Sequence, residues 1–77
     1  MTMKITRQVD ARNLSCPMPI VKTAIAVKTL APGDLLEVLA TDPGSVKDFA
    51  AWTATTGNEL LESTTEAGVF RFVIRRK

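Results

Sequence analysis

The sequence contains little of the chemistry that small proteins use to hold ligands: it has one cysteine, no histidine and no tyrosine. A single cysteine cannot close a disulfide within the chain, which excludes the disulfide-stapled class of small secreted domains. Without histidine the chain forms neither a Cys/His zinc site nor a catalytic pair of cysteine and histidine. We therefore expect neither a metal nor a bound cofactor.

Long apolar stretches are also lacking. No run approaches the about 20 residues that a membrane-spanning helix needs. Residues 1–4 lead directly into an alternating segment, without the basic and then apolar pattern of a signal peptide. The net charge is only +2, with both signs interspersed, which is typical of a soluble surface. The expectation is a cytoplasmic protein without membrane insertion.

The chain has 77 residues, which corresponds to a single domain over residues 1–77. A chain of this length buries only about 60% of the surface that its unfolded form exposes. An enclosed ligand cavity of ~300 Å³ or more is hard to build beside so thin a core. We expect any chemistry to lie at the surface and to involve a macromolecular partner.

Alternating or continuously apolar patterns predict four strands, at residues 4–10, 35–40, 59–65 and 69–75. Arg7 is the exception in the first strand, and Leu14 is expected to anchor the following loop to the core. The last two strands are separated by a turn short enough for a hairpin. In the last strand the apolar residues Phe70, Phe72 and Ile74 alternate with Arg71, Val73 and Arg75, which predicts a sheet with one face open to water.

Two prolines mark the start of a first helix. Pro17 and Pro19 fit a first helical turn, where backbone N–H groups have no partner within the helix. This placement makes Cys16 the N-cap, and Pro32 with Gly33 ends the helix. The side chains expected on its buried stripe are Ile20, Val21, Ala24, Val27 and Ala31, with Lys22, Thr23, Lys28 and Thr29 mostly elsewhere.

A second helix is predicted after the turn at residues 42–44. Ser45 is the expected N-cap, Asp48 occupies the capping-box position, and Gly57 is the expected C-cap. Its predicted buried stripe comprises Val46, Phe49, Ala50 and Thr53. The element order is βαβαββ, and we predict a two-layer α/β sandwich with both helices on one face of the sheet.

Cys16 is the candidate reactive group. A helix N-terminus favours an anion, so this position predicts a thiol that ionises more readily than free cysteine. Arg12 and Lys22 are candidates to add to this effect. The competing interpretation is a small buried hydrophobe, which is the more common fate of a lone cysteine. The flanking prolines favour the reactive interpretation, because they place Cys16 at a helix start and not on the apolar stripe.

The stretch Leu14-Ser15-Cys16-Pro17-Met18-Pro19 resembles the signature of the TusA (SirA-like) sulfur carrier family, a leucine shortly before a Cys-Pro-x-Pro motif. The likeness extends over essentially the whole chain. It includes Asp10-Ala11, Leu30 with Gly33, Asp42-Pro43 with Asp48, Gly57-Asn58-Glu59-Leu60, and Phe70 with Phe72 and Ile74. Asn13 stands where the family usually has glycine, and asparagine tolerates a positive φ better than most residues.

The resemblance implies a mixed four-stranded sheet and a sulfur relay. A donor, such as a cysteine desulfurase or a rhodanese-like protein, would load Cys16 with a persulfide, and an acceptor cysteine on a DsrE-like or similar protein would take the sulfur. The protein would then be a sulfurtransferase-type carrier, monomeric, and not a stand-alone catalyst. Destinations in the family include tRNA thiolation, molybdenum-cofactor maturation and oxidative sulfur metabolism.

Several other residues have two interpretations each. Pro17 and Pro19 would support the thiol. Met18 is either local packing or a soft contact for partners. Asp42 and Asp48 are turn and cap residues or docking residues, and Lys22 and Arg12 are solvated cations or docking residues.

Trp52 is a core residue or a docking anchor, and the basic residues Arg75, Arg76 and Lys77 form a solvated tail or a nucleic-acid contact.

Two other functions compete with the sulfur carrier. One is a non-catalytic interaction or regulatory module, since small α/β sandwiches host many functions. The other is RNA binding, suggested by the basic residues Arg71, Arg75, Arg76 and Lys77 on one sheet edge. The open face of the sheet lacks aromatic side chains on which bases stack, so we do not expect nucleic acid as a partner.

Overall fold

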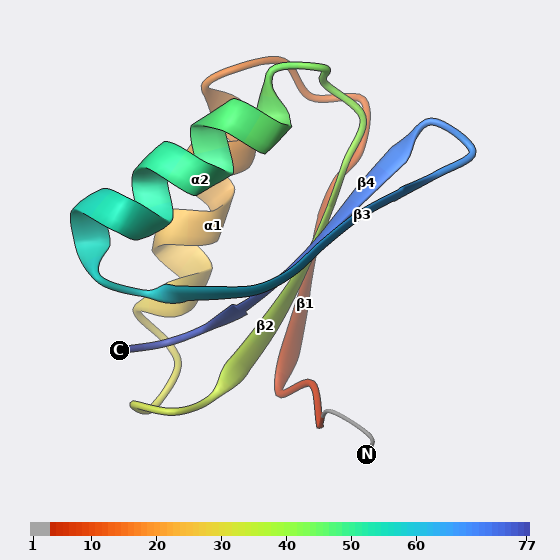
Figure 1. Cartoon of the computed structure of the whole chain (residues 1–77). Coiled ribbons are helices and arrows are strands. Elements are labelled where there is room, and N and C mark those ends of the chain that lie inside the picture. Colours follow the sequence, from red (N-terminus) through yellow and green to blue (C-terminus); the bar gives the residue numbers. More distant parts are fainter. Residues whose placement is uncertain (1–3) are drawn as a thin grey trace.

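The computed structural model describes residues 4–77; the expectation for residues 1–3 lies outside this range. Its elements follow the predicted order: β1 (Arg7–Ala11), α1 (Met18–Val27), β2 (Leu35–Ala40), α2 (Ser45–Thr56), β3 (Glu59–Glu66) and β4 (Val69–Arg75). The strands form one mixed sheet in the order β1-β2-β4-β3, with β1 parallel to β2 and β4 antiparallel to both of its neighbours. Both helices cover the same face (Figure 1), so the predicted fold class is confirmed.

The strand predictions differ from the structure only at their ends. β2 and β4 have the predicted limits, β3 extends to Glu66, and β1 begins at Arg7 instead of residue 4. A backbone hydrogen bond from Thr6 N to Leu35 O (2.9 Å) continues the pairing just before β1. No helix within residues 4–77 is long and apolar enough to cross a membrane.

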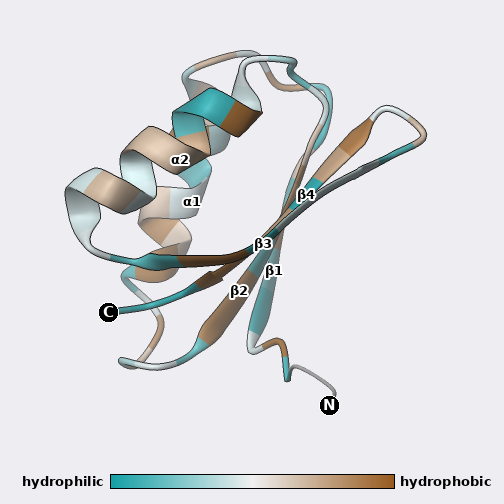
Figure 2. Cartoon of the chain, in the orientation of Figure 1, coloured by the Kyte–Doolittle hydropathy of each residue, from teal (hydrophilic) through white to brown (hydrophobic). Residues whose placement is uncertain are grey.

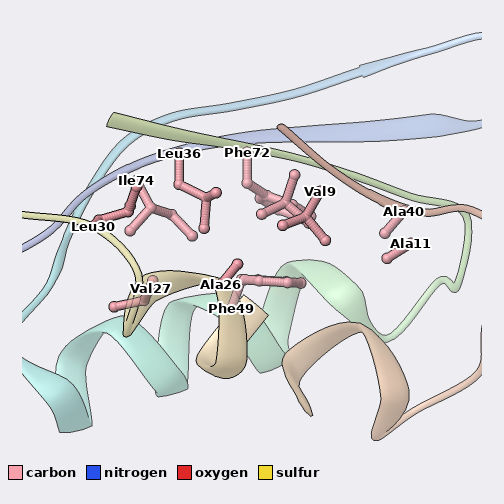
Figure 3. Close-up of a cluster of buried hydrophobic side chains, with 11 residues drawn as sticks. Val9, Ala11, Ala26, Val27, Leu30, Leu36, Ala40, Phe49, Phe72 and Ile74 are labelled. Atoms are coloured by element: carbon pink, nitrogen blue, oxygen red, sulfur yellow. The ribbon is translucent and has the colours of Figure 1, made fainter. Parts of the chain in front are cut away.

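The core lies between the sheet and the two helices (Figure 3). Hydrophobic segments of β2 and β4 supply its sheet side (Figure 2). Leu36, Val38, Phe72 and Ile74 are fully buried there, and Phe49 covers them from α2. Leu14 packs against this cluster, as predicted.

The opposite face of the sheet is more covered than predicted. Val73 points to this face but is fully buried. Its cross-strand neighbours are Glu37 and Glu62, and both carboxylates pair with Arg71. Side chains of an ion-pair cluster therefore lie around Val73, which explains why this face is not simply open to water.

The predicted buried face of α1 is only partly confirmed: Val27 is buried and Ile20 packs against the core, but other predicted positions are not buried. The helix ends at Val27, before the predicted stop at Pro32 and Gly33, and its buried residues are Pro19, Thr23, Ala26 and Val27. Ala31 and Val21 are exposed. Thr23 is fully buried. Its hydroxyl donates a hydrogen bond to the Pro19 carbonyl (2.8 Å), so this polar group has a partner inside the core.

The predicted N-terminal cap of α2 was also wrong. Gly44 is the N-cap, and neither Ser45 nor Asp48 makes a side-chain capping bond. Ser45 lies inside the helix, is buried, and its Oγ has no hydrogen-bond partner within residues 4–77. Val46 and Ala50 are exposed, so the buried stripe is Ser45, Phe49 and Thr53. The predicted C-cap is confirmed: Gly57 has φ 81° and its N–H donates to Thr53 O (2.9 Å).

Candidate functional site

The loop between β1 and α1 carries Cys16 and is fixed before it reaches the cysteine. Asn13 adopts φ 66°, as its tolerance of positive φ allows. Its N–H donates to the Thr41 hydroxyl (2.8 Å), which ties the loop to the segment after β2. Leu14 then packs on the core. The chain therefore presents Cys16 from an anchored position at the surface.

Cys16 is exposed and unbridged, and it lies just outside α1. The prediction that it is the N-cap was wrong by one residue, since Pro17 occupies that position. Met18 N donates to Ser15 O (2.9 Å), and Val21 N donates to Pro17 O (3.1 Å), so a turn runs directly into the first helical turn. The Cys16–Pro17 peptide bond is cis.

The two prolines take different places at this helix start. Pro17 is exposed, whereas Pro19 lies in the first turn and is buried. Neither position requires a backbone N–H, because the first turn has no acceptor within the helix. The prolines therefore fix where α1 begins without loss of a hydrogen bond, and this determines where the preceding thiol stands.

The electrostatic surroundings of Cys16 differ from the expectation. The pKa of the thiol is raised above its ordinary value, chiefly because the Asp48 carboxylate is placed to accept a hydrogen bond from it. Desolvation and the charges of Asp48 and Asp42 act in the same direction. This direction is opposite to the predicted lowering of the Cys16 pKa, because Asp48 of α2 and Asp42 of the preceding turn favour the protonated thiol.

Asp42 and Asp48 converge at the start of α2. Asp42 belongs to the turn before the helix, and its carbonyl accepts a hydrogen bond from Ser45 N (3.0 Å). Asp48 lies in the first turn of the helix. A Cβ atom at Gly44 would come within 3.1 Å of Asp42 Oδ2 and 3.7 Å of Asp48 Oδ2. Both carboxylates therefore gather over this glycine, at the end of the molecule where α1 also begins (Figure 1).

The two cations expected beside the thiol are engaged elsewhere. The Arg12 guanidinium pairs with Asp10 (Nε to Oδ1, 2.9 Å) and lowers the pKa of that carboxyl to about 2. Lys22 Nζ donates to the Asp10 carbonyl (3.1 Å). Neither is among the groups that act on the Cys16 pKa.

Met18 begins an exposed apolar strip on α1. Its side chain is 45% exposed, and Val21 (41%) and Ile25 (61%) follow at helical spacing. We call these three residues the apolar strip. Sequence reasoning missed it because the pattern assigned Val21 to the core and did not consider Ile25. The helical spacing of Met18, Val21 and Ile25 was the feature of the sequence that could have revealed the strip.

The remaining candidates have mainly structural contacts. Trp52 is half-buried against the core and packs edge-on to Phe49, with centroids 6.4 Å apart. The C-terminus is held and not a free tail, since Arg76 donates to the Leu30 carbonyl and Lys77 N donates to Asn58 Oδ1 (3.0 Å). The arginines suggested for RNA are also paired with carboxylates: Arg71 with Glu37 and Glu62, and Arg75 with Glu59.

Two hollows on the surface lie away from the thiol. A groove of about 270 Å³ runs between β1 and α1, and another of about 280 Å³ lies beside the β3–β4 hairpin. Cys16 lines neither of them. Residues 4–77 contain no cluster of three or more side chains suited to hold a metal ion.

Comparison with known proteins points to one family. A family model described as sulfurtransferase TusA matches residues 7–76. The sulfur carrier protein TusA of Allochromatium vinosum is 47% identical over 70 residues, which cover 91% of this chain and 92% of that protein. The putative sulfur carrier protein YrkI of Bacillus subtilis is 45% identical over 74 residues, covering 96% of this chain and 99% of that protein.

The fold has a match among solved structures. A SirA-like protein from Desulfitobacterium hafniense superposes with a TM-score of 0.81. It covers 91% of this chain and 96% of its own, at 22% sequence identity. At this identity the likeness concerns the fold alone.

Proposed function

Because this chain belongs to the TusA family, we propose that it is a sulfur carrier that holds sulfane sulfur as a persulfide on Cys16. The observation that carries the proposal is the place of its single cysteine, exposed at the surface and held just before the start of α1. Relatives along nearly the whole chain are named sulfur carrier proteins. The sulfur is covalent cargo, and no resident cofactor takes part.

The transfer requires no net oxidation. The Cys16 thiolate attacks the outer sulfur of a donor persulfide, forming a new S–S bond while the bond between that sulfur and the donor cysteine breaks. The donor leaves as a thiolate, and the proton that Cys16 lost balances its charge. Cys16 then carries S–SH. In the second step an acceptor thiolate attacks the outer sulfur in the same way and regenerates the Cys16 thiol.

The geometry suits a relay between two large partners. An exposed thiol on an anchored loop can be reached by a donor and later by an acceptor, whereas a thiol in a closed pocket cannot. A second cysteine nearby would attack the persulfide and discharge it as a disulfide, and the sequence has none. The exposed Met18 beside the thiol offers a soft and adaptable contact for both partners.

The partners follow from the chemistry. We expect the donor to be a cysteine desulfurase or a rhodanese-like protein, and the acceptor to present a reactive cysteine, as a DsrE-like protein would. Docking would involve residues around the thiol, among them Arg12, Lys22, Asp42 and Asp48. A cytoplasmic location, where thiols are kept reduced, suits this cycle.

The proposal is tested by mass spectrometry of the intact protein. After incubation with a cysteine desulfurase and cysteine, wild-type protein should gain the mass of one sulfur atom. A reductant should remove the gain, and Cys16→Ser should never show it. An unchanged mass with several cysteine desulfurases and rhodanese-like donors would contradict the proposal.

A further inference from the structure

A surface groove lies between the edge strand β1 and the helix α1. β1 ends the strand order β1-β2-β4-β3, so one side of its backbone has no strand partner within residues 4–77. The groove has a volume of about 270 Å³ and is lined by residues 7–10 of β1 and by Lys22, Ile25 and Ala26 of α1. We call it the β1–α1 groove. Because it follows four consecutive residues of a strand, it suits a short stretch of extended chain.

The β1–α1 groove is positively charged. Its one carboxylate, Asp10, is occupied by Arg12, which donates to both oxygens (2.9 and 3.0 Å). Arg7 and Lys22 make no ion pair within the described part of the chain. Arg7 donates to the Thr29 hydroxyl (2.9 Å), and Lys22 donates to the Asp10 carbonyl (3.1 Å). Each cation therefore keeps N–H groups for a further acceptor, and the groove favours an occupant with carboxylates.

The apolar part of the groove continues toward the thiol. Ile25 lines the groove, is 61% exposed, and is the last member of the apolar strip. The strip begins at Met18, two residues after Cys16. From Met18 to Ile25 the helix rises by about 10 Å, at about 1.5 Å per residue, and about three residues of extended chain span that distance. A segment in the groove can therefore present a sulfur atom at Cys16 only a few residues further along its own chain.

We propose that the β1–α1 groove binds an extended acidic segment of a sulfur-transfer partner, close in sequence to the partner's cysteine that exchanges sulfur with Cys16. This inference rests on the proposed function and adds the chemistry of the partner's docking segment. Its carboxylates pair with Arg7 and Lys22, and its apolar side chains contact Ile25. The free side of β1 contributes backbone hydrogen bonds, as when an extended peptide adds a strand to the edge of a sheet.

A second copy of this chain is a poorer occupant of the groove. The other edge strand, β3, carries three glutamates, but Glu59 pairs with Arg75 and Glu62 pairs with Arg71. Most of its charge is therefore neutralised within its own chain. Docking of β3 on β1 would also be a head-to-tail contact, which closes into a ring or continues as an open filament. An acidic segment of a different protein meets neither obstacle.

The first experiment measures peptide binding to the full chain by NMR chemical shifts. The probe is a short peptide in which glutamate alternates with valine, and the control peptide has lysine in place of glutamate. The acidic peptide should shift the backbone amides of residues 7–10 and 22–26 and should bind several-fold more tightly than the lysine peptide. Equal binding of the two peptides, or shifts confined to other elements, would overturn the proposal.

Variants of the lining residues test each contact. Arg7→Gln and Lys22→Gln should each weaken binding of the acidic peptide several-fold, and Ile25→Ala should weaken it as well. Lys47→Gln is the matched control, because it removes one positive charge from an exposed position on α2 outside the groove, and it should retain the wild-type affinity. All these side chains are exposed, so the variants should fold, and circular dichroism checks this. Unchanged affinity in the double variant of Arg7→Gln and Lys22→Gln would contradict the pairing.

Other occupants of the groove give different results. A second copy in the groove would appear in analytical ultracentrifugation as association that the double variant abolishes, whereas we expect a monomer in both. RNA in the groove would appear as an oligouridylate that competes with the acidic peptide, whereas we expect no competition. Either result would overturn the acidic segment as the occupant.

The closing experiment separates the groove from the sulfur carrier itself. Loading of Cys16 by a cysteine desulfurase, and transfer to a DsrE-like acceptor, are followed by intact mass with the acidic peptide present or absent. The peptide should slow at least one of the two steps several-fold, and the lysine peptide should slow neither. If both steps keep their rates while the acidic peptide is bound, the carrier function stands and the docking proposal is wrong. If the peptide binds in the groove but no donor loads Cys16, the proposed function fails, and docking of a sulfur-transfer partner fails with it.

Discussion

Phe49 of α2 stacks on Phe72 of β4, with ring centroids 4.5 Å apart and ring planes inclined by 22°. Both side chains are fully buried. This contact joins the helix that carries Asp48 to the centre of the sheet. The position of the acidic groups beside Cys16 therefore depends on the core, as well as on the local turn.

Replacing Phe49 with alanine should destabilise the protein strongly. Loss of a buried aromatic ring costs about 3–5 kcal/mol, a large share of the stability of so small a domain. Urea denaturation followed by circular dichroism measures the effect. Val46→Ala, at an exposed position on the same helix, is the control and should change stability by no more than about 0.5 kcal/mol. Equal effects in the two variants would contradict the core described here.

Asn13 should be sensitive to substitution because of its backbone conformation. Its φ is 66°, where a residue with a Cβ other than asparagine or aspartate is disfavoured by about 1–2 kcal/mol. Asn13→Ala should lose about this much stability, whereas Asn13→Gly should be nearly neutral. Denaturant midpoints of the two variants give the comparison. A glycine variant as unstable as the alanine variant would show that the side chain and not the backbone matters.

The Asp10–Arg12 pair predicts a specific pH dependence of stability. The Asp10 pKa is about 2 in the folded protein and 3.8 without this environment. The folded state thus favours the ionised form, so the stabilisation is present above about pH 4 and is lost as the pH falls toward about 2. As the pH falls from about 4 to about 2, the melting temperature of wild type should drop further than that of Asp10→Asn. Thermal unfolding at a series of pH values measures the two drops. Identical pH profiles would contradict the pairing.

The parts of the fold that follow from sequence are those set by neighbouring residues. The limits of β2 and β4 could be predicted to the residue. The apolar run of β2 and the strict alternation of β4 show directly which side chains are buried. Gly57 could be predicted as a C-cap because a left-handed position favours glycine. Cys16 could be placed within one residue of a helix start because Pro17 and Pro19 restrict where a helix can begin.

The parts that could not be predicted depend on contacts between distant segments. Thr23 is buried because α1 meets the sheet with a different face than the apolar spacing indicates, and its hydroxyl is satisfied within the helix. The raised pKa of Cys16 depends on Asp48, which is remote in sequence and belongs to another helix. The charge of a helix end can be anticipated from sequence, but the groups that another helix brings to it cannot.

The most direct test of the central claim is a transfer experiment with cysteine labelled with radioactive sulfur. A cysteine desulfurase should place the label on the wild-type protein, and a non-reducing gel should show it there until a reductant is added. Adding an acceptor protein with a reactive cysteine should move the label onto the acceptor, and Cys16→Ser should block both steps. Label that binds equally to the Cys16→Ser variant would contradict a persulfide on Cys16.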